Sequence, residues 1–310
     1  MLSDEIRKRL KKLNRTSLRD STPQNVSEQD LVGKSENPAD KPNAVRELPQ
    51  AFIKPSVIRA EEEEKEEFVS LGEAITGYEI TNARGKFLIV QRQMEDFTPD
   101  ASAINSRYYE FIGSFIVPEE MKYFSRQLRV FLRRHPSRIL YLDIETTGLW
   151  STPLFLVGLM FMDEGKLMVH QLFAREYAEE AAVLEYLSEF IRGFDTLITF
   201  NGKSFDMRFI RDRSRVNMVD FAWEGTHLDL LHEGRRRYRK KFENCRLITL
   251  EERVIGRLRS GDIPGHQIPD EYHYFVRTGN AWRLRSIFYH NGLDLITMAE
   301  LLLDILSFKE

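Results

Sequence analysis

Hydrophobic and polar positions divide the chain into regions of different character, and the first region is residues 1 to 68. These residues are polar and are interrupted by several prolines. A segment of this kind buries too little apolar surface to fold, so a disordered polar tail is expected. A short helix, which could dock on a partner or fray, is expected where apolar residues recur at helical spacing: Leu2, Ile6, Leu10 and Leu13.

A small β-rich accessory unit is predicted between residues 69 and 117. Segments 73–82, 85–91 and 109–117 are rich in β-branched and aromatic residues, and a hairpin turn at 82–85 separates the first two. The unit is too small to stand alone, so we expect it to pack on the main domain. Residues 118–136 are predicted to form a connecting helix that begins at a proline.

Residues 137 to 310 are predicted to form the main domain. A three-stranded meander comes first and is followed by β-α-β units. This order predicts an α/β domain with a mixed, five-stranded sheet. The expected strands lie at 139–145, 154–162, 166–173, 196–200 and 226–230, and the expected helices at 177–192, from about 205 and from 287 to 306.

The first of these strands ends in two acidic residues, Asp143 and Glu145. Because side chains alternate along a strand, both carboxylates point to one face and Ile144 points into the core on the other. Carboxylates of this kind hold Mg²⁺, although a lone D-x-E pattern is more often an acidic, solvated strand end.

A third aspartate follows the predicted strand at 196–200. Asn201 and Gly202 form a turn, Ser204 can cap the next helix, and Asp206 falls in its first turn. Alone, Asp206 would be read as a helix-dipole residue.

The last predicted helix carries His290 and Asp294, four residues apart. This spacing places the two side chains on one helical face, as a metal ligand beside a proton acceptor or as a surface ion pair.

In their order along the chain, the motifs D-x-E, N-x-x-x-F-D and a final histidine with aspartate resemble those of the DEDD 3′-to-5′ exonucleases of the ribonuclease-H-like superfamily. The chain is similar to the YprB-type bacterial group in that superfamily, over roughly residues 70 to 306. The further shared residues are His227 to His232, Leu250-Glu251, Asp262 to Gly265, Ile268-Pro269, Tyr272 and the final His290-Asn-x-x-Asp294.

The resemblance implies the ribonuclease-H-like fold, in which helices cover both faces of the mixed, five-stranded sheet. It also implies phosphodiester hydrolysis with two Mg²⁺ or Mn²⁺ ions about 3.5 to 4 Å apart. Asp143 would bridge the ions, Glu145 and Asp294 would hold the ion that activates water, and Asp206 would hold the ion at the leaving oxygen. His290 would act as the general base. Contacts to the nucleic acid are expected from Thr146, Thr147, Leu149 and Asn201.

The spacing of the histidine departs from the superfamily pattern, whose last motif is H-x-x-x-x-D or Y-x-x-x-D. Here Tyr289 has the histidine spacing and His290 has the tyrosine spacing. At about 100° per residue, four steps bring His290 back over Asp294, whereas five steps turn Tyr289 away. The YprB-type group shares the H-x-x-x-D arrangement.

Charge along the chain is segregated. The net charge is −3, yet residues 201 to 260 hold 15 Lys and Arg against 9 Asp and Glu. A dense basic run within this region could neutralise phosphates while its tyrosine stacks on a base, or it could be ordinary solvated surface. The residues proposed for nucleic-acid binding in this run are Arg235, Arg236, Arg237 and Tyr238.

Composition narrows the class of protein. With 310 residues, 42% hydrophobic, the chain can bury one core of normal size, and its single cysteine excludes an internal disulfide framework. Neither a zinc-type Cys/His cluster nor an apolar signal or membrane segment is found in the sequence, so a cytoplasmic protein without a membrane partner is expected.

Two other functions compete with the nuclease. The stretch from Asp143 to Thr147 resembles the nucleophile loop of haloacid-dehalogenase-type phosphatases, but Glu145 stands where that chemistry needs an aspartate. An inactive ribonuclease-H-like binding module would have no need of four carboxylates and a histidine. DNA is favoured over RNA because the YprB-type group resembles repair nucleases that often accompany a helicase, and the sequence leaves the oligomeric state open.

Overall fold

The structure is a computed structural model that describes residues 68–113, 124–149, 151–259 and 261–307. The predicted tail and its short helix lie outside these residues, apart from position 68, and so does the beginning of the predicted connecting helix at Pro118. In the described part of the chain, no helix combines the length and the apolar character needed to cross a membrane.

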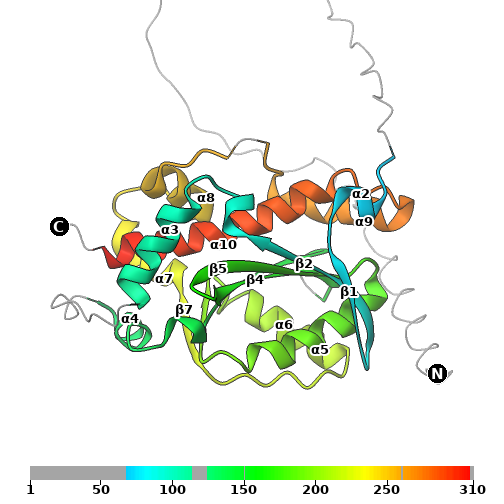
Figure 1. Ribbon diagram of the computed structural model, residues 1–310, viewed down its shortest axis with the longest axis horizontal. Helices are drawn as coiled ribbons and strands as arrows, with labels where there is room; N and C mark the ends of the chain where they lie inside the picture. The colour runs from blue at the N-terminus through cyan, green and yellow to red at the C-terminus, as the bar shows by residue number, and fades with distance from the viewer. Residues whose placement is uncertain (1–67, 114–123, 150, 260, 308–310) are drawn as a thin grey trace, which may run out of the picture. The chain divides into compact units, whose positions relative to one another are not determined.

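A mixed α/β fold is confirmed, but its sheet has seven strands in place of the expected five (Figure 1). The order across the sheet is β1-β2-β5-β4-β3-β6-β7, with parallel pairing from β3 through β6 to β7 and antiparallel pairing elsewhere. The strands are β1 (Tyr78–Asn82), β2 (Gly85–Gln93), β3 (Ile139–Thr146), β4 (Leu154–Asp163), β5 (Lys166–Phe173), β6 (Thr196–Thr199) and β7 (Thr226–Asp229).

The two additional strands are the predicted accessory hairpin. Strand β2 pairs antiparallel with β5, from Leu88 opposite Phe173 to Gln93 opposite Met168. The hairpin therefore extends the central sheet. Backbone hydrogen bonds along the edge of β5 account for its attachment.

Helices cover both faces of this sheet (Figure 1). Leu140, Leu142 and Ile144 of β3 face a core shared with α5 (Glu180–Ile191) and α6 (Asp206–Val216). Ile139 and Tyr141 face the opposite core, which contains most of α10 (Leu284–Leu306). Odd-numbered positions of β3 thus point towards α10.

Shorter helical segments complete the described fold. They are α2 (Leu71–Ala74), η1 (Met94–Asp96), α3 (Ala101–Tyr108), η2 (Tyr109–Gly113), α4 (Arg126–Phe131), η4 (Pro136–Arg138), η5 (Tyr177–Glu179), α7 (Leu230–Tyr238), α8 (Leu247–Leu250), η6 (Glu251–Ile255), η7 (Gly265–Gln267) and α9 (Ile268–Thr278).

Two predictions about local structure between residues 69 and 117 were wrong. The strand expected at 109–117 begins as the π-helix η2, which continues α3. Ala101, Ile104 and Tyr108 are buried at helical spacing, and this stripe outweighs the β-propensity of the aromatic residues that follow. Residues 73 and 74, expected in a strand, belong to α2.

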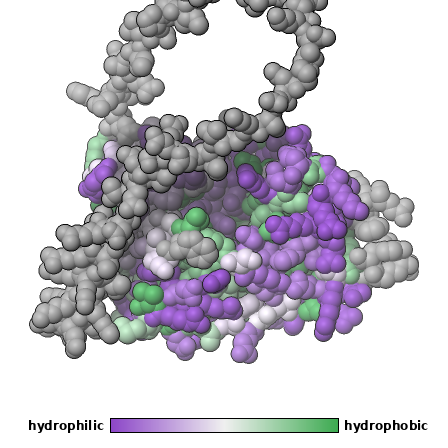
Figure 2. Space-filling view, turned by 180° about the vertical axis from the view of Figure 1, so that it is seen from behind, coloured by the Kyte–Doolittle hydropathy of each residue, from purple (hydrophilic) through white to green (hydrophobic). Residues whose placement is uncertain are grey.

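Hydrophobic residues reach the surface in small patches among hydrophilic ones (Figure 2). Leu149, Val216, Met218 and Leu258 are among the exposed large apolar side chains. Single exposed apolar residues are normal on a soluble surface, so none of them indicates a site without a further observation.

Candidate active site

Strand β3 directs two carboxylates towards α10. Asp143 and Glu145 are both partly buried on that face, while Ile144 between them is buried in the opposite core. The pairing of β3 with β4 shifts register between Glu145 and Thr146. The predicted alternation is therefore present, and the strand becomes irregular directly after its second carboxylate.

A tight turn after β6 places Asp206 at the beginning of α6. Asn201 has a left-handed backbone (φ 67°), and a Cβ on Gly202 would lie 2.5 Å from Thr199, so only glycine fits this turn. The backbone N–H groups of Asp206 and Ile144 donate to the Asp206 carboxylate, which is buried between α6 and β3.

The predicted cap by Ser204 is wrong. Phe205 occupies the N-cap position of α6 and makes no side-chain hydrogen bond there. The buried Asp229 shapes the turn before the helix, because its carboxylate accepts from the backbone N–H of Asn201 at 2.8 Å and of Lys203 at 3.0 Å.

On α10, His290 and Asp294 stand on one face as predicted, with 3.7 Å between His290 Nε2 and Asp294 Oδ2. The other ring nitrogen, Nδ1, lies 3.0 Å from both carboxylate oxygens of Asp262. Because an ionised carboxylate only accepts hydrogen bonds, Nδ1 is the donor in this pair. Asp262 thereby fixes the ring orientation of His290.

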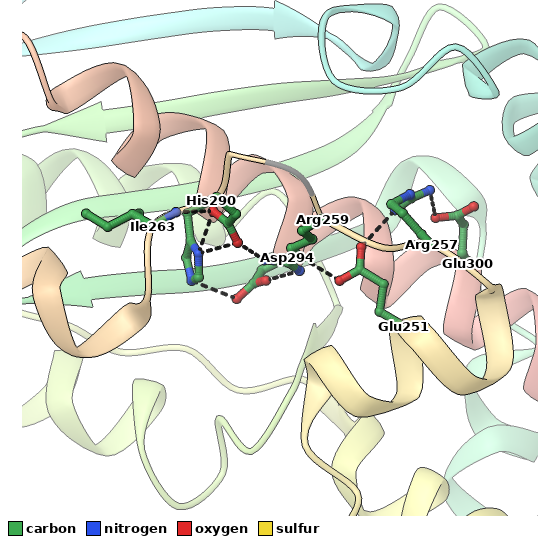
Figure 3. A network of polar contacts seen from close by, with 8 residues as sticks. Glu251, Arg257, Arg259, Ile263, His290, Asp294 and Glu300 are labelled. Atoms are coloured by element: carbon green, nitrogen blue, oxygen red, sulfur yellow. Dashed lines mark hydrogen bonds and ion pairs between the residues drawn. The ribbon is translucent and has the colours of Figure 1, made fainter. Parts of the chain in front are cut away.

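Arg259 connects these residues in one network (Figure 3). Its guanidinium donates to Asp294 Oδ1 at 2.5 Å, to Asp262 Oδ2 at 3.0 Å and to Glu251 Oε2 at 2.5 Å. Only 4% of its side chain is exposed. Arg257 continues the network from Glu251 to Glu300.

Tyr289 points elsewhere. Its ring stacks on Phe97 with 6.2 Å between centroids, and it lines a cavity together with Phe97 and Leu293. Of the two neighbouring candidates for the general base, His290 is therefore the one placed beside Asp294.

The carboxylates repel one another strongly. Burial, then Asp294, Glu145 and Asp206, raise the pKa of Asp143 well above its usual range. Burial raises the pKa of Glu145 to about 8, helped by Asp294 and Asp206 and opposed by His290. Burial also raises the pKa of Asp206 to about 7, with repulsion from Asp229 and Asp294. The carboxylates predicted as ligands thus lie within electrostatic reach of one another.

His290 responds in the opposite direction. Burial alone would lower its pKa, but the hydrogen bond with Asp262 and the charges of Asp294 and Glu145 outweigh it and raise the pKa to about 9. Arg259 and protonated His290 therefore compensate part of the negative charge.

The donor chemistry of this site fits hard divalent cations such as Mg²⁺ or Mn²⁺, which prefer carboxylate oxygens. Asp143, Glu145, Asp206 and Asp294 are the residues that would hold them. Among the residues that the structure describes, no three Asp, Glu, His or Cys side chains form a ready ligand cluster. Without a cation between them, these carboxylates repel one another.

The residues after Glu145 are placed close to the site but are used internally. Thr146 donates to the carbonyl of Gly148 at 2.8 Å, and Thr147 donates to that of Pro153 at 3.0 Å. Leu149, 70% exposed, lines a cavity with Phe205 and Arg208 at the beginning of α6, and Asn201 is exposed in the preceding turn.

The basic run lies on α7, away from the carboxylates. Arg235 and Arg236 are exposed, and Arg237 donates to the carbonyl of Ile305. Tyr238 is only 4% exposed and bonds Asp304, so the expected base stacking on this ring is wrong for the described conformation. At 1.5 Å per residue, Asp304 lies about 15 Å along α10 from Asp294.

Comparison with known proteins identifies the family. The family model described as the RNase H superfamily matches residues 140–305. The chain belongs to the RNase H superfamily. The chain is also 29% identical over 171 residues to the uncharacterized protein YprB of Bacillus subtilis. The matched region covers 53% of this chain and 41% of YprB. The chain thus spans about two fifths of the length of that relative.

A solved structure is also similar to this RNase H superfamily member. It is the family B DNA polymerase of the hyperthermophilic archaeon Pyrobaculum calidifontis, with 18% sequence identity and a TM-score of 0.43. The match covers 54% of this chain and 25% of the polymerase.

Several residues of the site could not be assigned from sequence reasoning. Asp262 and Glu251 belong to stretches shared with the YprB-type group, but their spacing gives them no role. Arg259 is one of many arginines. Asn291 belongs to the shared motif His290-Asn-x-x-Asp294, but the motif gives it no role. A tertiary contact reveals each of them.

Proposed function

We propose that the chain is a metal-dependent 3′-to-5′ exonuclease that hydrolyses phosphodiester bonds of nucleic acid, with DNA as the favoured substrate. One observation carries this proposal: acidic side chains from β3, α6 and α10 lie within electrostatic reach of one another and beside His290. Membership of the RNase H superfamily supports the same class of reaction.

Asp143, Glu145, Asp206 and Asp294 would hold the divalent ions. When bound, such ions polarise the scissile phosphate and stabilise the charge that develops on the attacking and leaving oxygens. These positions come from three elements that are held by the sheet and by the docking of α10. The scaffold therefore fixes the site on rigid elements, which suits precise positioning of a phosphodiester.

With bound divalent ions offsetting the carboxylate charges that raise its pKa, His290 would be neutral and would take the proton of the attacking water through Nε2. Asp262 occupies Nδ1, so Nε2 is the ring nitrogen left for proton transfer. The position of Nε2 beside Asp294 supports this role, since a base must stand next to the ligands that hold the reacting water. Arg259 keeps Asp294 and Asp262 oriented around the ring.

A direct assay tests the proposal. Single- and double-stranded DNA and RNA, labelled at either end, are incubated with the purified chain in Mg²⁺, Mn²⁺ or EDTA. We expect mononucleotides released from the 3′ ends of DNA, with metal present and with no product in EDTA.

Asp143→Asn is the matched inactive variant. The amide keeps the size of the side chain but removes a ligand charge, so activity should fall by at least about 100-fold while the protein stays folded. Cleavage that persists in EDTA, or an active Asp143→Asn protein, would contradict the metal-dependent mechanism. If mononucleotides are released from RNA and not from DNA, the substrate is RNA.

A further inference from the structure

A buried amide links the central sheet to α10 directly at Asp143. Asn291 is fully buried, and its Nδ2 donates to Asp143 Oδ2 at 2.9 Å. Its Oδ1 accepts from Gln171 Nε2 at 2.9 Å. Gln171 is also fully buried, and its Nε2 donates a second bond, of 2.7 Å, to the carbonyl of Phe288. Because Gln171 offers a donor to Oδ1, the Nδ2 group of Asn291 must face Asp143.

The strand register explains how one amide reaches both partners. Asp143 on β3 pairs with Gly158 on β4, and Gly158 pairs with Gln171 on β5. Paired residues share a face of a sheet, so these three positions form a row across three strands, under α10. Asn291 spans the row from Gln171 to Asp143.

The middle position of the row has to be glycine. A Cβ at Gly158 would lie 2.2 Å from Oδ1 and 2.7 Å from Nδ2 of Asn291. The backbone of Gly158 has no left-handed φ, so space alone accounts for the glycine. The missing side chain opens the gap that the amide fills.

We propose that Asn291, seated over Gly158 and oriented by Gln171, is a positioning residue that fixes the carboxylate of Asp143 for metal binding. The inference rests on the proposed function, in which Asp143 is a ligand. Hydrogen bonds to the ligating carboxylate are what set its rotation and direct its other oxygen towards a cation. A donor on Oδ2 leaves Oδ1 and one lone pair of Oδ2 for that purpose.

Four variants separate positioning from packing: Asn291→Ala, Gly158→Ala, the double variant and the control Asn217→Ala. Mn²⁺ affinity is measured by titration calorimetry, and the melting temperature is measured in EDTA. Asn291→Ala should weaken Mn²⁺ binding 10- to 100-fold. Gly158→Ala should do the same, because the added methyl displaces the amide, and it should also lower the melting temperature by several degrees.

The double variant is decisive. Truncating Asn291 makes room for the methyl introduced at position 158, so the melting temperature should recover relative to Gly158→Ala, while Mn²⁺ binding stays weak. Asn217 offers a matched control, since its Nδ2 donates to the buried Glu180 at 2.9 Å. Asn217→Ala should leave Mn²⁺ affinity unchanged.

Recovery of Mn²⁺ affinity together with stability in the double variant would reduce Asn291 to a packing residue and overturn the inference. If the single variant Asn291→Ala does not fold, Mn²⁺ affinity is measured on the double variant, in which the methyl at position 158 fills the space left by the amide. Mn²⁺ binding by Asp143→Asn distinguishes failure of the inference about Asn291 from failure of the proposed function. If Asp143→Asn loses Mn²⁺ and Asn291→Ala retains it, the inference fails; if Asp143→Asn binds as the unaltered protein does, the proposed function fails.

Discussion

Replacing Asp206 by Asn should stabilise the metal-free protein. The folded-state pKa of Asp206 is about 7 against an ordinary value of 3.8, and its side chain is buried. At about 1.4 kcal/mol per pKa unit, keeping this carboxylate ionised costs the fold about 4 kcal/mol at pH 8. Burying the polar amide of Asn also costs free energy and offsets part of this stabilisation. We therefore expect Asp206→Asn to raise the free energy of unfolding by roughly 2 kcal/mol.

For a domain of this size, 1 kcal/mol shifts the melting temperature by about 2 to 4 °C, so the gain should be about 4 to 8 °C in EDTA at pH 8. The sign of its pH dependence follows from the raised pKa. The stability contributed by Asp206 is present below pH 3.8 and is lost as the pH rises through about 7. At pH 5 the folded protein keeps the proton, and the gain from Asp206→Asn should nearly vanish.

Calorimetric or fluorescence melting at pH 5 and pH 8, in EDTA and in Mn²⁺, measures both effects. Asp212→Asn is the control, because it makes the same chemical change at an exposed position of the same helix. In Mn²⁺ the unaltered protein should gain stability and Asp206→Asn should gain much less. A melting temperature that falls at pH 8, or rises equally at both pH values, would refute the electrostatic reasoning.

Further predictions address catalysis, binding and stability. His290→Ala should slow turnover by about 10²- to 10⁴-fold with Mn²⁺ binding retained, whereas Tyr289→Phe should leave turnover unchanged; steady-state kinetics decide, and the reverse pattern would reassign the base. If Arg235 and Arg236 contact phosphates, changing both to Ala should flatten the log–log salt dependence of single-stranded DNA binding by about 1.4, and an unchanged slope would leave them as surface. Burial and nearby cations lower the pKa of His227 to about 4, so the imidazole is neutral in the folded protein. Its contribution to the free energy of unfolding is therefore lost as the pH falls from about 6.5 towards 4. His227→Gln should flatten this loss in pH-dependent melting curves, and an unchanged curve would contradict it.

Periodicity was sufficient for the parts of the site that depend on one element alone. Alternation along β3 placed Asp143 and Glu145 on one face, and the helical repeat placed His290 over Asp294 and turned Tyr289 away. Each of these predictions needs only the geometry of a single strand or helix, which the chain specifies locally.

Contacts between distant segments could not be predicted in this way. The pairing of β2 with β5 and the bonds from Arg259 to Asp294 join positions far apart in sequence, and no local pattern encodes either. Tyr238 is different, because it was predictable in principle. It completes a buried stripe on α7 with Leu230, Leu231 and Gly234, at helical spacing, and that stripe places its ring in the core.

The dispersal of the site over β3, α6 and α10 has a consequence for synthesis of the chain. The ribosome makes Asp143, Glu145 and Asp206 first, and Asp294 follows roughly 90 residues after Asp206, several seconds later at about 5 to 20 residues per second. Until α10 has been made and docks on the sheet, the site lacks His290, Asp294 and the amide that holds Asp143. A partly made chain therefore has no complete site, and any nuclease activity appears only when folding of the domain is finished.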